Sequence, residues 1–382
     1  MQKFFFILAT LLLITLTATS CGVETPPQPT ATATRTTAST AISTTIPPTT
    51  AAAETAVPPT TPPLPTETTP PTATAVAEET AVATPPITAP VNAIIVDHTS
   101  VALFEQIPEE YLQAAAALHM LFIDRSVGAN ISDGLSCLAF DSDEAAPSHC
   151  KRYTHTVPAY SSDPSEVNWA RSGGYNRDNW SYDFWEEGGG CNQWYDKVGC
   201  FINMMATRIN QYDVVSFQLS YLAVEETSDI LAQPGGFFAD NADRYDVYDL
   251  AAYEAQYPDK VFIYWTTSLA RGIGSQIATD FNDQMRQYAI ANSKPLFDVA
   301  DILSHAPDGS PCYDNRDGIA YDNGNNSENY ADDGINQLAI CPHYTTETDG
   351  GHLGSVSVGK IRVAKAFWVL MAEIAGWQPN GD

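Results

Sequence analysis

An abrupt change from apolar to polar residues near position 124 constrains the fold more than any other feature of the chain. The largely apolar run 118–123 ends in D-R-S at 124–126, and a helix-compatible pattern begins at Gly128. Such a run is typical of a strand buried on both faces of a parallel sheet, and open α/β sheets bind ligands at the carboxyl ends of their strands. The sequence therefore predicts an α/β fold that delivers Ser126 to this edge.

Similar apolar runs alternate with helix-compatible segments along residues 93–382, as a doubly wound sheet requires. The predicted strands are Leu118–Ile123, Asp213–Leu219, Lys260–Thr266 and Pro295–Val299. The predicted helices are Pro108–Ala117, Gly128–Cys137, Phe201–Asn210, Tyr245–Tyr257, Ser275–Asn292 and Ser355–Gly376. Segments 138–200 and 305–348 are predicted to be long loops. We expect one domain with a central parallel sheet between two layers of helices.

A candidate acid and base stand in the sequence D-G-G-H-L at 349–353. A serine hydroxyl is a weak nucleophile until a base removes its proton, and a histidine base is usually held in one tautomer by a carboxylate. The two glycines allow a tight turn that places Asp349 and His352 on one side of a loop. The pattern indicates Ser126 as nucleophile, His352 as base and Asp349 as orienting acid. Taken singly, the serine and the aspartate also suit helix caps, and the histidine suits a helix end.

Together these stretches resemble the SGNH/GDSL hydrolases, and more narrowly a bacterial SGNH-like subgroup. The matching motifs are S-V-G-A-N-I at 126–131, D-G at 133–134, L-F-D-V-A at 296–300 and D-G-G-H-L at 349–353. The resemblance covers roughly the whole region after residue 92. It implies a three-layer α/β/α, flavodoxin-like fold and an ester hydrolase that works through an acyl-enzyme, without a metal or an organic cofactor. It implies little about the substrate.

The resemblance also implies hydrogen-bond donors for the negative oxygen that forms during acyl transfer. Ser126 supplies a backbone N–H. The family glycine corresponds to Gly173 or Gly174, with segment 188–190 as the alternative.

Two departures from the family pattern affect this site. The asparagine expected after the strand 213–219 is absent, and Gln218 and Ser220 are the polar residues there. We favour Ser220 as the substitute donor because it lies nearer the carboxyl edge of the sheet. In addition, D-R-S replaces G-D-S, which leaves Asp124 either as a structural cap or as a partner of Arg125.

The amino-terminal region is predicted to serve export rather than folding. Residues 1–20 have a lysine followed by an apolar core and small residues, which is typical of a signal peptide. A-T-S-C at 18–21 resembles a bacterial lipobox, so we expect lipidation of Cys21; cleavage and plain secretion are the alternative. Segment 21–92 is rich in Thr, Pro and Ala and is predicted to be a disordered tether, which glycosylation would stiffen. The protein is thus expected outside the cell, anchored by lipid to the outer face of the membrane.

Six further cysteines in an exported chain predict disulfides. Their order suggests three local bridges, Cys137 with Cys150, Cys191 with Cys200 and Cys312 with Cys341. A zinc cluster is the rival interpretation, and the absence of C-x-x-C pairs argues against it. The formal charge of −28 makes nucleic acid and anionic lipid surfaces poor partners.

Aromatic residues concentrate in the predicted loop between 153 and 195. They are Tyr153, Tyr160, Trp169, Tyr175, Trp180, Tyr182, Phe184, Trp185, Trp194 and Tyr195. Such residues either pack into a small core of their own or form a stacking platform for sugar rings. The platform and export favour an O-acetyl ester on a carbohydrate as substrate; a lipid or another small acyl ester is the second choice. A non-catalytic glycan-binding protein on the same fold is the alternative from a different class. The acidic segment 314–333 could bind calcium through carboxylates and carbonyls, but the absence of the ordered spacing of a calcium loop argues against it.

Overall fold

The computed structural model describes the part of the chain that forms the α/β domain. The described residues are 93–140, 145–151, 175–185, 190–271, 275–314, 321–322, 327–328, 334–345, 347, 350–354 and 358–379. The chain separates into two units, Met1–Glu78 and Glu79–Asp382, and all described residues belong to the second. The predicted signal peptide, Cys21 and the tether lie outside the described residues.

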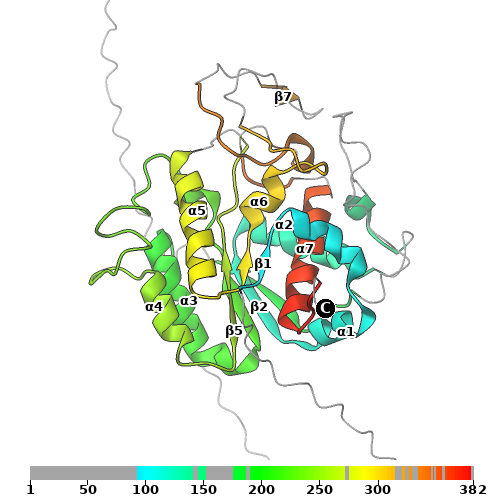
Figure 1. Ribbon diagram of the computed structural model, residues 1–382, viewed down its shortest axis with the longest axis horizontal. Helices are drawn as coiled ribbons and strands as arrows, with labels where there is room; N and C mark the ends of the chain where they lie inside the picture. Colours follow the sequence, from blue (N-terminus) through cyan, green and yellow to red (C-terminus); the bar gives the residue numbers. More distant parts are fainter. Residues whose placement is uncertain are drawn as a thin grey trace, which may run out of the picture. The chain divides into compact units, whose positions relative to one another are not determined.

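A six-stranded sheet forms the centre of the domain (Figure 1), and each pair of neighbouring strands in it is parallel. The strands are β1 (Ile95–Val96), β2 (Met120–Asp124), β3 (Trp180–Phe184), β4 (Val214–Phe217), β5 (Val261–Trp265) and β6 (Leu296–Phe297). Their order across the sheet is β1-β6-β5-β4-β2-β3. The predicted parallel α/β sheet is therefore confirmed.

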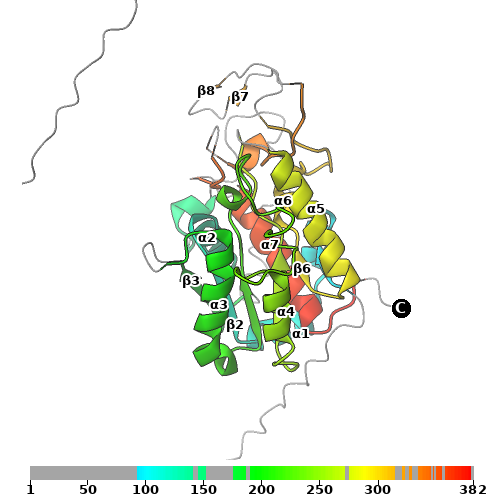
Figure 2. The ribbon, with the colours of Figure 1, turned by 90° about the vertical axis from the view of Figure 1, so that its left-hand side faces the viewer.

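Helices cover both faces of this sheet, which gives the predicted three layers. The helices are α1 (Glu109–Ala117), α2 (Ser126–Leu138), α3 (Trp194–Arg208), α4 (Val247–Glu254), α5 (Gln276–Ala291), α6 (Val299–Ser304) and α7 (Val358–Ile374). Figures 1 and 2 show α3, α4 and α5 on one face and α1, α2 and α7 on the other. Short 3-10 helices include η1 (Thr99–Gln106), η6 (Tyr221–Ala223) and η8 (Pro342–Tyr344), and β7 (Tyr321–Asp322) pairs with β8 (Ser327–Glu328) as a small antiparallel ribbon.

Helix α7 is buried on nearly all sides, because it packs on the sheet and also against its neighbours in the same layer. Its contact with α2 is close: a Cβ added at Gly134 would lie 2.2 Å from the carbonyl oxygen of Lys360. This packing fixes the helix that follows Ser126 against the last helix of the domain. Within the described residues, no helix combines the length and the apolar character needed to cross a bilayer.

The four predicted strands are confirmed with ends that differ by one or two residues, whereas β1 and β3 of this sheet and the ribbon β7–β8 were not predicted. β1 has only two residues, too few for a recognisable pattern. β3 falls in the predicted loop 138–200 and is an edge strand that pairs only with β2. Its sequence, W-S-Y-D-F, lacks the continuous apolar character of the central strands, because only one side of it is paired and its exposure is mixed.

Three disulfides join the cysteine pairs that their order predicted. They are Cys137–Cys150, Cys191–Cys200 and Cys312–Cys341. The zinc interpretation is wrong for these six residues, because each sulfur is used in a bridge.

The aromatic residues of the predicted loop pack mainly into the domain core. Trp180 stacks close to Trp368 of α7, and Tyr175 packs on Phe104. Tyr175, Trp180, Trp185 and Trp194 are all buried. Tyr153, Tyr160 and Trp169 lie outside the described residues. The four buried rings stabilise the core and present no stacking surface to a sugar.

The strand order also fixes where a ligand site is expected. After β2 the chain adds β3 on one side and then crosses to add β4 on the other, so the winding direction changes between β2 and β4. In such sheets the crevice beyond the carboxyl ends of these two strands is the usual binding site. Ser126 follows β2, and Ser220 follows β4.

Candidate active site

Ser126 is the first residue of α2 and follows β2 after a single residue. The turn is held by Asp124, whose Oδ2 accepts a hydrogen bond from the backbone N–H of Gly128 at 2.7 Å. A Cβ at Gly128 would lie 2.6 Å from the Cβ of Asp124 and 2.8 Å from the ring of Tyr182, so the close turn requires glycine here. The Tyr182 hydroxyl donates to the carbonyl oxygen of Arg125. Asp124 is thus a structural cap of the helix that carries Ser126.

His352 lies beside this serine, as the sequence predicted. Its Nε2 is 2.7 Å from Oγ of Ser126, although 226 positions separate the two residues. The loop is held against α2 because Oδ1 of Asn130 accepts a hydrogen bond from the backbone N–H of Leu353 at 2.8 Å. The Thr345 hydroxyl donates to the carbonyl oxygen of His352. Asn130 in the S-V-G-A-N motif therefore positions the histidine loop.

The carboxylate bonded to the other ring nitrogen of His352 belongs to Glu347, whereas the sequence predicted Asp349 for this contact. Oε1 of Glu347 is 2.6 Å from Nδ1 of His352, and its Oε2 accepts the backbone N–H of His352 at 2.9 Å. Asp349 lies outside the described residues. The side chain of Glu347, five positions before the histidine, can bond the ring because Gly350 leaves room for it. A Cβ at Gly350 would be 1.9 Å from Oε2 of Glu347. The second glycine has another role, since a Cβ at Gly351 would be 2.3 Å from the ring of Tyr221.

Carboxylate, imidazole and hydroxyl thus form a continuous chain of hydrogen bonds. The side chains of Glu347 and His352 retain 30% and 35% of their solvent exposure, so the chain opens to the surface. A serine whose hydroxyl contacts a histidine that is oriented by a carboxylate is the arrangement that activates serine for attack on a carbonyl carbon.

The two polar residues considered as substitute oxyanion donors have different environments. Gln218 is fully buried. In the amide orientation that satisfies both of its polar atoms, its nitrogen donates to Oδ2 of Asp124 at 3.1 Å and its oxygen accepts the backbone N–H of Ser268 at 3.1 Å. Its amide is therefore occupied inside the sheet. Ser220 is buried, and its Oγ has no hydrogen-bond partner among the described residues. Gly174 and Gly173 lie outside the described residues.

Register places Ser220 at the correct end of the sheet. β4 pairs with β2 so that Phe217 is opposite Ile123, and Ser220 and Ser126 each follow three residues later. The Ser220 hydroxyl, which has no partner among the described residues, therefore stands at the same edge as Ser126.

Beneath the site lie two oppositely charged buried groups. Burial raises the pKa of Asp124 to about 6, while the backbone N–H groups of Arg125 and Gly128 and the charge of Lys197 act in the opposite direction. Burial lowers the pKa of Lys197, which the charge of Asp124 partly offsets. Sequence reasoning did not identify Lys197, because a lysine on a helix is ordinarily solvated and only the tertiary structure buries this one.

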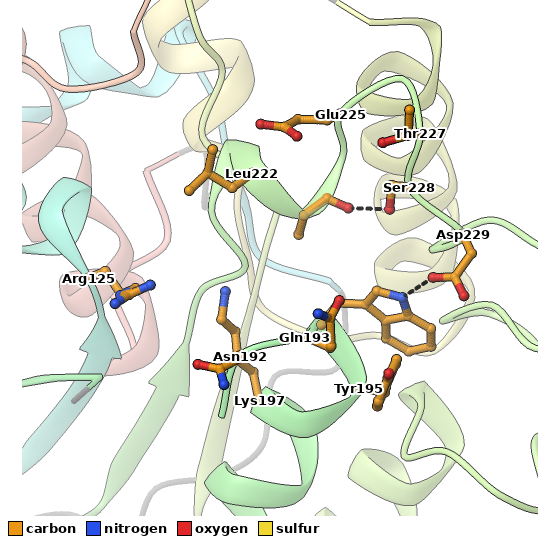
Figure 3. A pocket seen from close by; sticks show the side chains of 12 residues that line it. Arg125, Asn192, Gln193, Tyr195, Lys197, Leu222, Glu225, Thr227, Ser228 and Asp229 are labelled. Atoms are coloured by element: carbon orange, nitrogen blue, oxygen red, sulfur yellow. Dashed lines mark hydrogen bonds between the residues drawn. The ribbon is translucent and has the colours of Figure 1, made fainter. Parts of the chain in front are cut away.

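A pocket of about 480 Å³ is lined in part by Arg125, the residue before Ser126 (Figure 3). Its lining comes from Arg125, the first turn of α3 and segment 222–229. Arg125 immediately precedes Ser126, and Tyr221 at the start of η6 places its ring edge-on to His352, 6.1 Å between centroids. Arg125 and Leu222, which line the pocket, are therefore the chain neighbours of Ser126 and of Tyr221.

Among the described residues, two groups outside this site could offer metal ligands, and the first is His98, Asp301 and His305. The two imidazole rings stack with centroids 4.0 Å apart, and both approach the carboxylate of Asp301 through Nδ1. These contacts account for the side chains without an ion. The other group, Cys137 and Cys150 with His149, contains a disulfide. Of the acidic segment 314–333 only Asp314 and the ribbon β7–β8 are described.

Comparison with protein-family models, with curated proteins and with solved structures gave no match to this chain. The assignment of function consequently depends on the residues and geometry given above.

Proposed function

We propose that the protein is an SGNH/GDSL-type serine hydrolase that cleaves a carboxylic ester. The observation that carries the proposal is the chain from Glu347 through His352 to Ser126, with contacts of 2.6 and 2.7 Å. Its position at the change of winding direction in a parallel sheet, where such folds bind ligands, adds support. The motif resemblance points to the same class of enzyme.

In the proposed reaction, Oγ of Ser126 attacks the ester carbonyl carbon while Nε2 of His352 takes its proton. The tetrahedral intermediate collapses, the C–O bond to the alcohol breaks, and His352 returns the proton to the departing oxygen. Water, deprotonated by the same imidazole, then attacks the acyl-enzyme and releases the acid and Ser126. Glu347 keeps Nδ1 protonated and stabilises the imidazolium. It therefore takes the role that the sequence predicted for Asp349.

Two donors suit the negative oxygen of the intermediate. The backbone N–H of Ser126 lies at the amino terminus of α2, where helix N–H groups point outward and the helix dipole favours negative charge. The Ser220 hydroxyl is the second, because it is buried at the same sheet edge without a partner among the described residues. A hydroxyl takes the place of the family asparagine in this scheme.

For substrate and location, the proposal is a surface-tethered, lipid-anchored enzyme that removes an O-acetyl group from a carbohydrate. Three disulfides are compatible with export. A lipid or other small acyl ester is the alternative substrate, and a non-catalytic glycan-binding lipoprotein is the alternative of a different class. The hydrogen-bonded serine and histidine favour turnover over binding alone.

Hydrolysis of an aryl acetate by residues 93–382 tests the reaction. We expect steady turnover in the wild-type domain and loss of essentially all of it in Ser126→Ala. Ser132→Ala on the same helix is the matched control and should retain activity. Turnover in Ser126→Ala equal to that of the wild type would exclude the mechanism.

Mass analysis of the protein from its native host tests the anchoring. We expect a mature chain that begins at Cys21 with a lipid attached. A mature chain that starts at another residue, or an unmodified Cys21, would contradict this part of the proposal.

A further inference from the structure

Lys197 is a buried lysine that lines the pocket next to Arg125, and it has no role in the proposed ester-cleaving reaction. Lys197 belongs to the first turn of α3, and only 5% of its surface is exposed. Its ammonium forms no hydrogen bond and no ion pair with any described residue, and Asp124 influences it only through its field. A lysine side chain held in a largely buried place without a partner for its ammonium is costly, so an anion that paired this ammonium would stabilise it.

The ammonium points into the pocket. Figure 3 shows Lys197 rising from α3 toward the space that the Arg125 side chain enters from the other side. The two cations are near enough for the charge of Arg125 to oppose protonation of Lys197. In a protein with a formal charge of −28, the described lining of this pocket holds two cations, Lys197 and Arg125, and two carboxylates, Glu225 and Asp229.

The described carboxylates that line the pocket form no ion pair with Lys197. Asp229 is bonded to Nε1 of Trp194 and forms an ion pair with Arg244, so its charge is already matched. Glu225 stands at the opposite rim in Figure 3. An anion in the pocket would therefore meet the ammonium of Lys197 on one side and the matched carboxylate of Asp229 on the other.

We propose that this pocket binds a carboxylate of the substrate, so that the enzyme acts on esters that carry a negative charge close to the scissile bond. Lys197 is the specificity-determining residue, since it is the cation that an anionic ligand would pair. The inference depends on the proposed function, because the carboxylate is assigned to the ester substrate. Both an acidic sugar, with the charge on the alcohol, and a dicarboxylic monoester, with the charge on the acyl group, present this chemistry.

Two pairs of model esters distinguish these sources. The first pair is 4-acetoxybenzoate and its methyl ester, which differ in a charge on the leaving alcohol. The second is 4-nitrophenyl hemisuccinate and its methyl ester, which differ in a charge on the acyl group. The kcat/KM of each ester is first divided by the rate constant of its hydrolysis by hydroxide. We expect this corrected value for the anionic member of one pair to exceed that of its neutral partner on the order of ten- to a hundredfold, which is the range of a hydrogen bond to a charged group.

Replacement of Lys197 by methionine should reduce this ratio to near one, and Lys197→Arg should retain part of it. Lys260→Met is the matched control and should leave the ratio unchanged, because that lysine precedes β5 at the amino-terminal end of the strands, whereas Ser126 lies at their carboxyl end. A wild-type ratio near one for both pairs would overturn the anion site, as would a ratio that survives Lys197→Met. Lys197→Gln provides a second neutral variant if the methionine protein does not fold.

A binding measurement separates this inference from the proposed function. The Ser126→Ala variant and the double variant Ser126→Ala/Lys197→Met are each titrated calorimetrically with the two anionic esters. The affinity for one of these esters should be ten- to a hundredfold lower in the double variant. Lysine-dependent binding in a protein whose wild type turns over no ester would retain the anion site and overturn the hydrolase. Turnover of neutral esters with no lysine-dependent binding would overturn the anion site and retain the hydrolase.

Discussion

The glutamate that bonds His352 provides the sharpest test of the site, because Asp349 is the acid that the motif would suggest. In Glu347→Ala, Nδ1 of His352 loses its acceptor at 2.6 Å, and the backbone N–H of His352 loses its acceptor at 2.9 Å. The imidazole is then free to adopt the wrong tautomer, and the imidazolium formed during attack has no counter-charge. We therefore expect a fall in kcat with a much smaller change in KM.

The size of this fall follows from the exposure of the pair. Loss of a fully buried triad acid costs about 10⁴-fold in serine hydrolases. Here 30% of Glu347 and 35% of His352 remain exposed, so water partly replaces the lost carboxylate. We expect a decrease of about 10²- to 10³-fold, or about 3–4 kcal/mol of transition-state stabilisation.

The assay is steady-state hydrolysis of an aryl acetate by Glu347→Ala, Glu347→Gln and Asp349→Ala, with thermal unfolding to confirm that each variant is folded. Glu347→Gln should fall between the alanine variant and the wild type, because it keeps one acceptor but loses the charge. Asp349→Ala should stay within a few-fold of the wild type. A large loss in Asp349→Ala together with a small loss in Glu347→Ala would refute the assignment.

Three further predictions follow from other contacts. Ser220→Ala should lower kcat about ten- to a hundredfold with little change in KM if its hydroxyl donates to the oxyanion; loss of stability with unchanged kcat in the folded fraction would identify a structural serine. Gly350→Ala should lower kcat by a similar factor, because its Cβ would lie 1.9 Å from Glu347 Oε2 and displace that carboxylate; wild-type kinetics in this variant would contradict the described loop. Burial, reinforced by the charge of Asp97, raises the pKa of Glu373 from 4.5 to about 7, so its stabilising contribution is complete below pH 4.5 and is lost as the pH rises through 7. Glu373→Gln should therefore match the wild type in urea unfolding at pH 4 and exceed it by about 1–3 kcal/mol at pH 8; equal stability at pH 8 would show that the carboxyl group is not destabilised by burial.

Several features of this protein could be predicted from the sequence, because they depend on local patterns. Buried parallel strands are continuous apolar runs, so the central strands could be recognised, and β2 led directly to Ser126. The disulfides join neighbours in the cysteine order, which made their pairing predictable. Ser126 and His352 could be paired because each stands in a short motif.

Other features depend on distances between residues that local patterns do not encode. The edge strand β3 acquires its partner only from the folded sheet, and so its mixed sequence did not distinguish it from a loop. In T-E-T-D-G-G-H two carboxylates precede His352, and only the path of the loop at Gly350 brings Glu347 to Nδ1. Lys197 has the sequence context of an ordinary surface lysine on a helix, and burial beside Asp124 and the pocket is a property of the tertiary structure alone. The sequence determined the sheet and the pairing of Ser126 with His352, whereas the tertiary packing decided which carboxylate bonds that histidine and which charges surround it.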